Sequence, residues 1–426
     1  MKAVILAGGR GSRIAAEYPD IPKPMIPVCG KPVLQHQIET LRKEGVREFI
    51  LVTGYLGERI EAYFGDGSAF GVHITYYREP LPLGTAGALF SLGLPEDFLL
   101  CGGDLIFDFS LRDMVAFHEK NNALATLLAH PNDHPFDSTL IRAEESGRIN
   151  ALISKEETPA ACANLCNAGI QLLSPRLLDL YRADGYADLD RDLLRPALAT
   201  RRLFAYRSYE YVRDMGTPTR LRAVQADIRA GIVAAKHRKN LQRAVFLDRD
   251  GTVNVYKGLI TDPQALELIP GAAAAIRRMN KAGYLVVIIT NQPVIARGDC
   301  TLAELRRIHD RLETLLGAQG AYIDGLYFCP HYPEPGFPGE ILEYKIKCDC
   351  RKPAPGMLLR AAEELHIDLS ASYMVGDNPI DAEAGINAGC KPIFLRCGKQ
   401  CPAPTGVPVF DDLKQFSDTL SAEKRT

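Results

Sequence analysis

Residues 3–13 read Ala-Val-Ile-Leu-Ala-Gly-Gly-Arg-Gly-Ser-Arg, and this stretch decides the fold expected for the first half of the chain. Its apolar start predicts a buried strand, and its glycines let backbone N–H groups approach a polyphosphate. Two common phosphate-binding motifs do not fit. The Rossmann glycine motif requires glycine at Ile14, and the Walker loop ends in Gly-Lys-Ser/Thr, which is not present here. A plain strand-to-helix turn stays an equal alternative for this segment taken alone.

Apolar runs and helix-like segments alternate along the rest of the chain, which predicts an α/β fold with a largely parallel, buried sheet. A basic stretch at residues 236–240 interrupts the alternation, and a new buried run starts at Ala244. We therefore expect two Rossmann-like three-layer domains, at residues 1–234 and 244–426, joined by a linker at 235–243. The clearest expected strands are 3–7, 49–53, 74–77, 98–101, 244–247, 284–290, 373–376 and 392–395, and the clearest expected helices are 31–44 and 59–64.

Bulk composition argues against several classes of protein. A length of 426 residues favours two or three domains, and a net charge of −2 gives no sign of nucleic-acid or anionic-membrane binding. No run of about eighteen apolar residues is present, and the first apolar run is too short for an export signal. The eleven cysteines are an odd number in a large chain without such a signal. We expect a cytoplasmic protein with small-molecule partners, and its oligomeric state stays open.

Several polar residues of the first half stand where a phosphorylated ligand can be bound. Lys23 lies between two prolines that fix the backbone, and Asp104 ends a predicted buried strand. A small-residue loop at 83–89 suits close contact with a base or ribose, and Asp214 precedes a tight turn. In isolation, each has an ordinary explanation as a solvated loop residue.

Together, these segments resemble the motifs of sugar-1-phosphate nucleotidyltransferases, and most closely those of guanylyltransferases acting on mannose- or heptose-1-phosphate. The resemblance implies a GT-A-like fold and covers about 220 residues. Its motifs are Leu6-Ala7-Gly8-Gly9-x-Gly11-x-Arg13, Pro22-Lys23-Pro24-Met25, Leu83-Gly84-Thr85, Gly103-Asp104, Asn167-Ala168-Gly169-Ile170 and Asp214-x-Gly216-Thr217-Pro218.

The resemblance also implies roles for these residues. Asp104 and Asp214 would hold Mg²⁺ bridging the phosphates of GTP, and Arg13 and Lys23 would neutralise the α-phosphate and leaving group. The remaining contacts would come from Gly8, Gly9, Gly11, Gly84 and Thr85 for the nucleotide, and from Asn167 and Gly169 for the sugar. The family's Glu-Lys-Pro motif is replaced around residues 155–159, so the sugar contact there departs from the pattern.

In the second half, residues 245–252 read Val-Phe-Leu-Asp-Arg-Asp-Gly-Thr and place two aspartates directly after a buried strand. A calcium loop of the EF-hand type is excluded, because Thr252 and Leu259 occupy positions that require acidic ligands. Two solvated turn residues are the remaining plain explanation. An alternative is a division of labour in which Asp248 attacks phosphorus and Asp250 transfers protons.

This half resembles the haloacid-dehalogenase phosphatases, whose motifs match Asp248, Asp250, Thr290, Lys352 and Asp377. The resemblance implies Mg²⁺ held by Asp248, Asp250 and Asp377, and phosphoryl oxygens held by Thr290 and Lys352. Asp381 is expected to contact the metal ligands rather than the metal itself. The short segment between the first two motifs leaves no room for a large cap domain.

Cys329, His331, Cys348 and Cys350 form two close pairs that suit a structural Zn²⁺ site, although four unrelated reduced residues are a possible alternative. A capless, zinc-bearing member resembles the heptose-1,7-bisphosphate 7-phosphatases and the related histidinol-phosphate phosphatases. This closer resemblance adds Asn291 and Arg351 as expected substrate contacts. Pro293-Val294 and Asn378 depart from the pattern and leave the fine selectivity open.

The fusion itself is informative, because heptose 1-phosphate is the product of such a phosphatase and the substrate of such a transferase. The resemblance therefore implies removal of the 7-phosphate from D-glycero-α-D-manno-heptose 1,7-bisphosphate, followed by guanylyl transfer from GTP to give GDP-heptose. Two alternatives stay open: a different sugar or base, such as mannose 1-phosphate, and a chain in which one half is a catalytically silent module.

Overall fold

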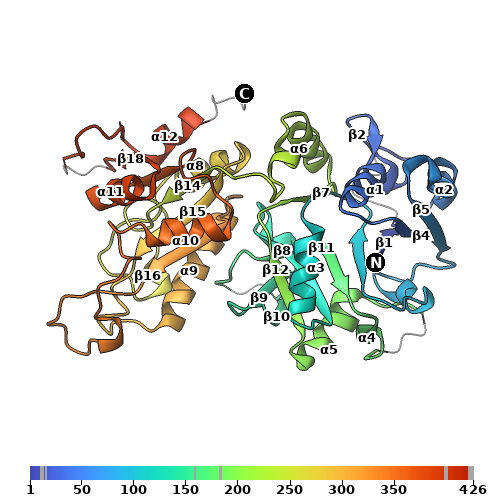
Figure 1. The fold of residues 1–426 in the computed structure, drawn as a ribbon, viewed down its shortest axis with the longest axis horizontal. Helices are drawn as coiled ribbons and strands as arrows, with labels where there is room; N and C mark the ends of the chain where they lie inside the picture. The colour runs from blue at the N-terminus through green and yellow to red at the C-terminus, as the bar shows by residue number, and fades with distance from the viewer. Residues whose placement is uncertain (10–13, 15–16, 158–159, 182–184, 398–401, 421–426) are drawn as a thin grey trace. The chain divides into compact units, whose positions relative to one another are not determined.

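The computed structural model describes the whole chain except residues 10–13, 15–16, 158–159, 182–184, 398–401 and 421–426 (Figure 1). The chain forms two compact α/β units, which confirms the expected fold class. The domain bounds given above stay a prediction. The first unit comprises Met1–His130, Ile141–Ile153 and Asn167–Lys239, and the second comprises Pro131–Leu140, Ser154–Cys166 and Asn240–Thr426.

A mixed sheet forms the centre of the first unit, with the strand order β10-β9-β11-β6-β1-β4-β5 and with β8 and β12 extending it beside β11. Strands β6, β1, β4 and β5 are parallel, whereas β11 is antiparallel to β6. The strands are β1 (Lys2–Ala7), β4 (Glu48–Thr53), β5 (His73–Arg78), β6 (Phe98–Gly102), β8 (Ala125–His130), β9 (Leu140–Ala143), β10 (Ile149–Ile153), β11 (Cys166–Leu173) and β12 (Leu203–Arg207).

Two short antiparallel pairs accompany this sheet, namely β2 (Pro27–Val28) with β3 (Lys31–Pro32), and β7 (Leu105–Asp108) with β13 (Tyr211–Asp214). The helix expected from residue 31 begins later, because Pro32 stands before its first turn. The loop at 83–89 leads into a short 3-10 helix, Gly87–Ser91. The helices are α1 (Val33–Lys43), α2 (Gly57–Phe64), α3 (Leu111–Lys120), α4 (Pro175–Leu178), α5 (Arg195–Ala197), α6 (Pro218–Arg229) and α7 (Ile232–Ala235).

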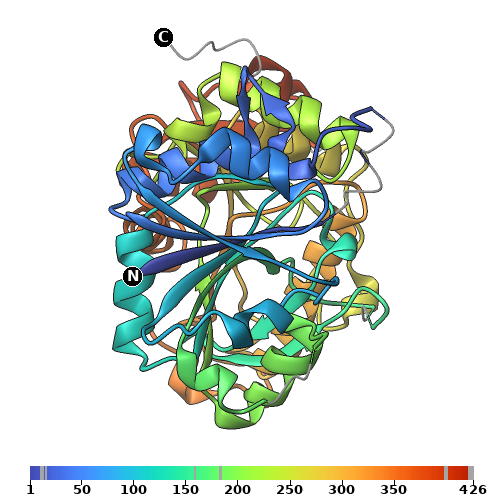
Figure 2. The same cartoon turned by 90° about the vertical axis from the view of Figure 1, so that its right-hand side faces the viewer.

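Strand β1, dark blue in Figure 2, lies inside the first sheet between β4 and β6. The chain passes from β1 to β4 and β5 on one side and then returns to the other side of β1 as β6. Such a reversal of strand order leaves a crevice at the carboxyl ends of the parallel strands, where α/β sheets bind their ligands. Gly8 follows β1 at this position.

The second unit contains a parallel sheet in the order β16-β15-β14-β17-β18-β19. Its first strand, β14, again lies between the next strand and a later one, so the order reverses there too. The strands are β14 (Ala244–Leu247), β15 (Leu285–Asn291), β16 (Gly325–Cys329), β17 (Tyr373–Gly376), β18 (Lys391–Leu395) and β19 (Val409–Phe410).

Helices cover the second sheet and bury its central strands. Every residue of β14 is buried, as expected for a parallel strand covered on both faces. Helices α10 and α11, orange in Figure 1, pack against strands β15 to β18. The helices are α8 (Ala272–Lys281), α9 (Leu302–Gly317), α10 (Gly356–Glu364), α11 (Pro379–Ala388) and α12 (Leu413–Leu420).

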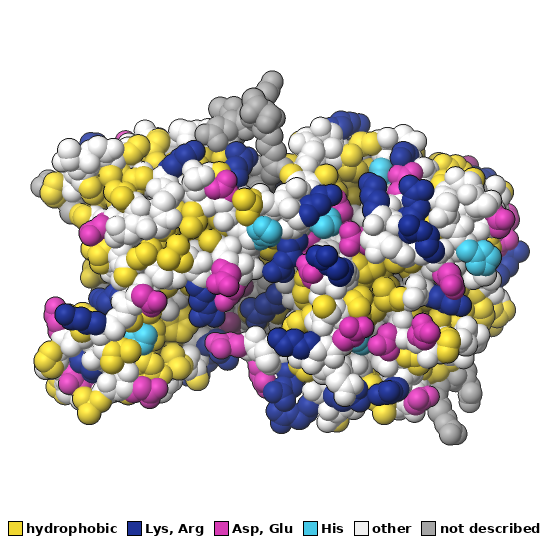
Figure 3. Space-filling model, in the orientation of Figure 1, with side chains coloured by type: hydrophobic (Ala, Val, Ile, Leu, Met, Phe, Trp, Pro, Cys, Tyr) yellow, Lys and Arg dark blue, Asp and Glu magenta, His cyan; other side chains and the backbone are white. Residues whose placement is uncertain are grey.

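The surface carries charges of both signs. On the face shown in Figure 3, basic and acidic side chains are interspersed, in keeping with the small net charge. Among the described helices, none has the length and apolar character needed to cross a membrane.

Candidate active sites

Three strand ends of the second unit converge on Asp248. This residue follows β14, and its N–H donates to Val375 O at 3.0 Å, which ties it to β17. Thr290 and Asn291 end β15, and Asp377 follows β17. The structure therefore brings together residues that are far apart in the sequence, at the position where the strand order reverses.

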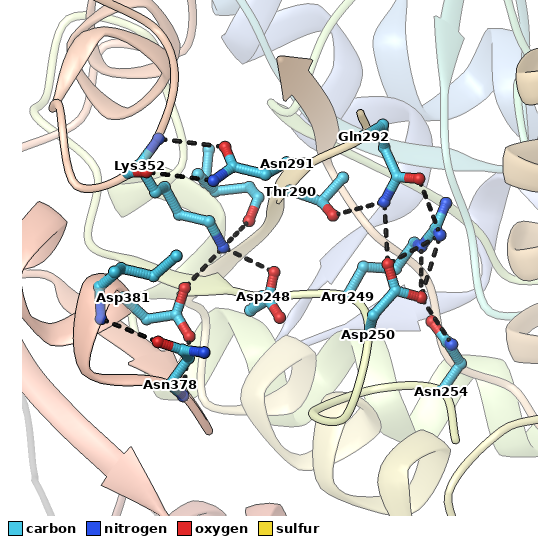
Figure 4. A network of polar contacts seen from close by, with 12 residues as sticks. Asp248, Arg249, Asp250, Asn254, Thr290, Asn291, Gln292, Lys352, Asn378 and Asp381 are labelled. Atoms are coloured by element: carbon cyan, nitrogen blue, oxygen red, sulfur yellow. Dashed lines mark hydrogen bonds and ion pairs between the residues drawn. The ribbon is translucent and has the colours of Figure 1, made fainter. Parts of the chain in front are cut away.

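Lys352 is the electrostatic centre of this group (Figure 4). Its Nζ lies 2.6 Å from Asp248 Oδ1 and 2.6 Å from Asp381 Oδ1, and donates to Ile289 O at 2.9 Å. The lysine and Asp381 side chains are each only 2% exposed. Burial raises the pKa of Asp248 to about 7, although the lysine acts in the opposite direction. Two buried carboxylates thus share one buried cation.

The same carboxylates fit a divalent cation. One ligand oxygen from each of Asp248, Asp377 and Asp381 lies within 4.8 Å of the others, and all three residues are buried. Carboxylate oxygens are the ligands that Mg²⁺ prefers. Asp381, expected only behind the metal ligands, therefore lies close enough to be a ligand itself.

The Asp250 side chain is bound by a different set of residues. Its carboxylate accepts hydrogen bonds from Arg249, Asn254 and Gln292, at donor–acceptor distances between 2.8 and 3.2 Å. It does not belong to the carboxylate group around Asp248 that could hold a metal. The expected participation of Asp250 in Mg²⁺ binding stays a prediction.

Asn291 and Arg351 fix the backbone that carries the lysine. Asn291 Nδ2 donates to Lys352 O at 3.1 Å, and the Lys352 N–H donates to Asn291 Oδ1 at 3.0 Å. Arg351 donates to His331 O at 3.1 Å. These contacts position Lys352, whereas the expected contacts of both residues with the substrate stay predictions.

The four predicted zinc ligands meet in one cluster. Cys348 Sγ lies 3.6 Å from Cys329 Sγ and 3.2 Å from Cys350 Sγ, and His331 Nδ1 lies 3.7 and 3.3 Å from the Cys329 and Cys350 sulfurs. A tetrahedral ion with Zn–S bonds of about 2.3 Å separates its sulfur ligands by about 3.8 Å. Three sulfurs and one ring nitrogen at these distances fit Zn²⁺.

In the first unit, Lys23 and Asp104 come together beside the end of β1. Lys23 Nζ forms an ion pair with Asp104 Oδ2, and both side chains are mostly buried. The Gly103 N–H donates to Leu6 O at 2.9 Å, which holds this segment against β1. A side chain at Gly8 would begin 2.7 Å from a carboxylate oxygen of Glu79, so this carboxylate would have to move away from the end of β1.

Asp214 reaches the same edge through the pairing of β13 with β7. Its register partner is Leu105, and the Met215 N–H donates to Asp104 O at 3.0 Å. The Asp214 carboxylate accepts from Gly216 N at 2.7 Å and from Arg220 at 3.1 and 3.2 Å. The two aspartates expected to hold Mg²⁺ therefore stand on adjacent backbone segments.

The remaining predicted contacts of the transferase gather around residues 187–190. A side chain at Gly84, where φ is +78°, would begin 2.4 Å from Ala187 O. Thr85 accepts from Leu189 N at 2.7 Å, and Asn167 Nδ2 donates to Asp190 at 3.4 Å. Asn167 also accepts from Gly169 N at 3.1 Å. Their binding roles stay predictions.

Two predicted residues, Gly11 and Arg13, lie outside the described residues, and Gly9 is described and exposed. Four residues not selected from the sequence belong to the sites: Glu79 and Arg220 in the first unit, and Arg249 and Gln292 in the second. Arg249 and Gln292 stand within or beside recognised motifs, so the sequence could have indicated them. The positions of Glu79 and Arg220 depend on tertiary contacts.

Comparisons with known proteins identify both units. Residues 2–231 match the family model described as nucleotidyl transferase, and residues 349–416 match one described as HAD-hydrolase-like. The chain is 42% identical over 184 residues to D-glycero-beta-D-manno-heptose-1,7-bisphosphate 7-phosphatase of Salmonella typhi, covering 43% of this chain and 95% of that protein. Identity to the protein of the same name from Escherichia coli (strain K12) is 44% over 158 residues, covering 37% and 80%.

Solved structures also resemble parts of the chain. D,D-heptose 1.7-bisphosphate phosphatase from B. bronchiseptica, complexed with magnesium and phosphate, is 33% identical with a TM-score of 0.37, covering 42% of this chain and 98% of that chain. HddC from Yersinia pseudotuberculosis, complexed with GMP-PN, is 22% identical with a TM-score of 0.45, covering 53% and 99%.

The two sites and the matched regions define a nucleotidyltransferase unit followed by a HAD-type phosphatase unit. The chain belongs to the nucleotidyl transferase family and, through its C-terminal unit, to the family of the heptose-bisphosphate 7-phosphatases. This confirms the families and the two enzyme classes expected from the sequence.

The buried carboxylates make stability depend on pH when Mg²⁺ is removed. A carboxyl with a raised pKa in the folded protein binds its proton more tightly there, so the free energy of unfolding falls as pH rises from about 4 to about 7. Asp248→Asn should reduce this slope and raise the melting temperature at pH 8, because asparagine buries no negative charge there and Lys352 keeps Asp381 as its counter-ion.

Thermal unfolding of the full chain at several pH values checks this expectation. The melting temperature is read from the unfolding transition that added Mg²⁺ shifts. Asp299→Asn, at an exposed position of the same unit, is the matched control. An Asp248→Asn protein that is less stable than the wild type at pH 8 without Mg²⁺ would contradict the charge balance described.

Proposed function

We propose that the chain carries out two consecutive steps of nucleotide-activated heptose synthesis. The second unit removes the 7-phosphate of heptose 1,7-bisphosphate, and the first unit transfers GMP from GTP to the resulting heptose 1-phosphate. The supporting observation is that relatives named for this phosphatase match a chain that also carries a nucleotidyltransferase unit. GTP and sugar phosphates would place both steps in the cytoplasm.

Phosphate removal begins with Asp248. Its carboxylate oxygen attacks phosphorus, the bond to the sugar oxygen breaks, and Asp250 gives that oxygen a proton. Water then attacks the aspartyl-phosphate, Asp250 takes a proton from the water, and phosphate leaves. Lys352 and the Thr290 hydroxyl hold the phosphoryl oxygens and offset their charge. A Mg²⁺ ion bound by the neighbouring carboxylates would supply further charge neutralisation.

Guanylyl transfer requires two anions to be held together, and no nucleophilic side chain is needed. An oxygen of the sugar 1-phosphate attacks the α-phosphorus of GTP, and the bond to the β-phosphate oxygen breaks to release pyrophosphate. Lys23 contributes positive charge near Asp104, and Asp104 and Asp214 are the carboxylates that would hold Mg²⁺ at the phosphates.

The proposed choice of guanine rests on Glu79. Its half-buried carboxylate faces Gly8 and accepts from Leu83 N at 3.4 Å, and burial raises its pKa. An ionised carboxylate accepts hydrogen bonds but cannot donate them. Guanine offers adjacent N–H donors on one edge, whereas adenine offers a donor beside an acceptor on its corresponding edge. A carboxylate at the nucleotide loop therefore favours GTP.

The Cys₃His cluster, in the same proposal, holds a structural Zn²⁺. Metal analysis of the purified chain should give about one zinc per chain. Cys348→Ser should lose that zinc and lower the melting temperature of the phosphatase unit. Zinc retention at wild-type level in this variant would exclude the cluster as the site.

Replacing one carboxylate in each unit should separate the two activities. Asp248→Asn should abolish phosphate release from heptose 1,7-bisphosphate and leave pyrophosphate release from heptose 1-phosphate and GTP intact. Asp104→Asn should lower pyrophosphate release by at least about a hundredfold and leave phosphate release intact. Separate assays of the two products measure both effects. Loss of both activities from either substitution would contradict independent sites.

Glu79→Gln should weaken the discrimination between purines. The ratio of kcat/KM for GTP to that for ATP is expected to fall about tenfold to a hundredfold. The carboxylate offers two acceptor oxygens to the two guanine N–H donors, whereas the glutamine amide offers one oxygen and an NH₂ group that cannot accept from guanine. Glu96→Gln, exposed in the same unit, is the control. An unchanged ratio would remove Glu79 from base selection.

A further inference from the structure

Gln292 contacts two side chains with different expected roles (Figure 4). It is 2% exposed and follows the end of β15. Its Nε2 donates to Asp250 Oδ2 at 2.8 Å and to Thr290 Oγ1 at 2.9 Å, and its Oε1 accepts from Arg249 at 3.1 Å. One amide group therefore joins the expected proton-transfer residue to an expected phosphoryl-binding residue.

The surroundings select one orientation of this amide. With Nε2 facing Asp250 and Oε1 facing Arg249, each donor meets an acceptor. The reversed amide would place its oxygen against a carboxylate and its NH₂ group against a guanidinium, which has no acceptor. Both Nε2 hydrogens are used in the observed arrangement, so this side chain has no spare donor for the substrate.

This contact directs the Thr290 hydroxyl. The side chain has a single O–H donor, and Thr290 is 1% exposed. Because its oxygen accepts from Gln292, its hydrogen is free to donate in another direction. A phosphoryl group on Asp248 would supply the acceptor.

Arg249 holds the same carboxylate from a second side. Its side chain is fully buried, and its Nη2 lies 3.0 and 2.8 Å from the two Asp250 oxygens. Asn254 Nδ2 adds a hydrogen bond of 3.0 Å to Oδ1. Charge-assisted hydrogen bonds of this kind are stronger than neutral ones and fix direction as well as distance.

We propose that Gln292, supported by Arg249, is a positioning residue for the phosphatase reaction. It fixes the Asp250 carboxylate relative to the Thr290 hydroxyl, so that proton transfer and phosphoryl binding act on one ester. This inference rests on the proposed phosphatase activity, and it concerns residues to which no role was assigned above.

The two chemical steps depend on this arrangement to different extents. In the first step, the Asp248 O–P bond forms, the ester P–O bond breaks, and a proton passes from Asp250 to the leaving sugar oxygen. With p-nitrophenyl phosphate, the leaving group departs as the phenolate and needs no proton. In the second step, the water O–P bond forms, the Asp248 O–P bond breaks, and a water proton passes to Asp250 for either substrate.

Gln292→Leu tests the proposal in the full chain with Mg²⁺. This change keeps the size of the side chain and leaves the Thr290 hydroxyl free to donate. For the sugar bisphosphate, kcat should fall about tenfold to a hundredfold with little change in KM. With p-nitrophenyl phosphate, a rapid burst of about one phenolate per chain should precede slow turnover, because only the second step is impaired.

A second variant and a control separate positioning from folding. Gln292→Glu should also raise KM, because its carboxylate repels Asp250 and competes for the Thr290 hydroxyl. Gln319→Glu, exposed in the same unit, should behave as the wild type. The burst amplitude counts the folded, reactive sites in the Gln292→Leu preparation.

Wild-type kinetics for Gln292→Leu would overturn the inference, and so would equal loss with both substrates without a burst. An inactive wild-type protein would instead overturn the proposed phosphatase function and the inference with it.

Discussion

The geometry of the phosphatase site depends on the ion pairs of Lys352 with Asp248 and Asp381. A buried ammonium group is tolerated only where opposite charges and hydrogen bonds surround it. Much of the neighbouring structure meets that requirement. Asn291 binds the backbone of the lysine, and Asp381 accepts from Asn378 N at 3.1 Å in the capping box of α11. The catalytic geometry and the local fold are therefore stabilised by the same contacts.

Both units have their expected ligand site at the same position of the sheet. In each sheet, the first strand lies between the strand that follows it and a later strand that returns to its other side. The backbone after that first strand opens into the crevice, with Gly8 in one unit and Asp248 in the other. The proposed chemistry differs because the first unit places glycines and Lys23 there, for which we propose phosphate binding, whereas the second places Asp248, the proposed nucleophile.

Local patterns were sufficient to predict most of the strands and the residues at their ends. Apolar runs gave the positions of β1, β4, β14 and β17 within a residue or two, and the spacing of Cys329, His331, Cys348 and Cys350 predicted their cluster. The antiparallel pairing of β7 with β13 was not predicted, because it joins segments about a hundred residues apart.

The partners of the site residues were harder to predict for the same reason. Arg249 is a charged residue between the two aspartates, yet it is fully buried, and Asp250 and Gln292 accept hydrogen bonds from one side of its guanidinium. Glu79 stands on a loop after β5, and only the packing of that loop near Gly8 brings it to the segment for which we propose nucleotide binding. Sequence motifs thus predicted the reacting groups, whereas the structure shows which neighbouring groups contact them.

A time course with the purified wild-type chain tests the central claim most directly. The chain would be supplied with Mg²⁺, GTP and either the α or the β anomer of heptose 1,7-bisphosphate. Phosphate, pyrophosphate and GDP-heptose would be measured separately over time. The account predicts that phosphate appears first, and that pyrophosphate and GDP-heptose then rise together, with the α anomer preferred for the second step. Pyrophosphate release before any phosphate, or phosphate release with no nucleotide sugar formed from either anomer, would contradict it.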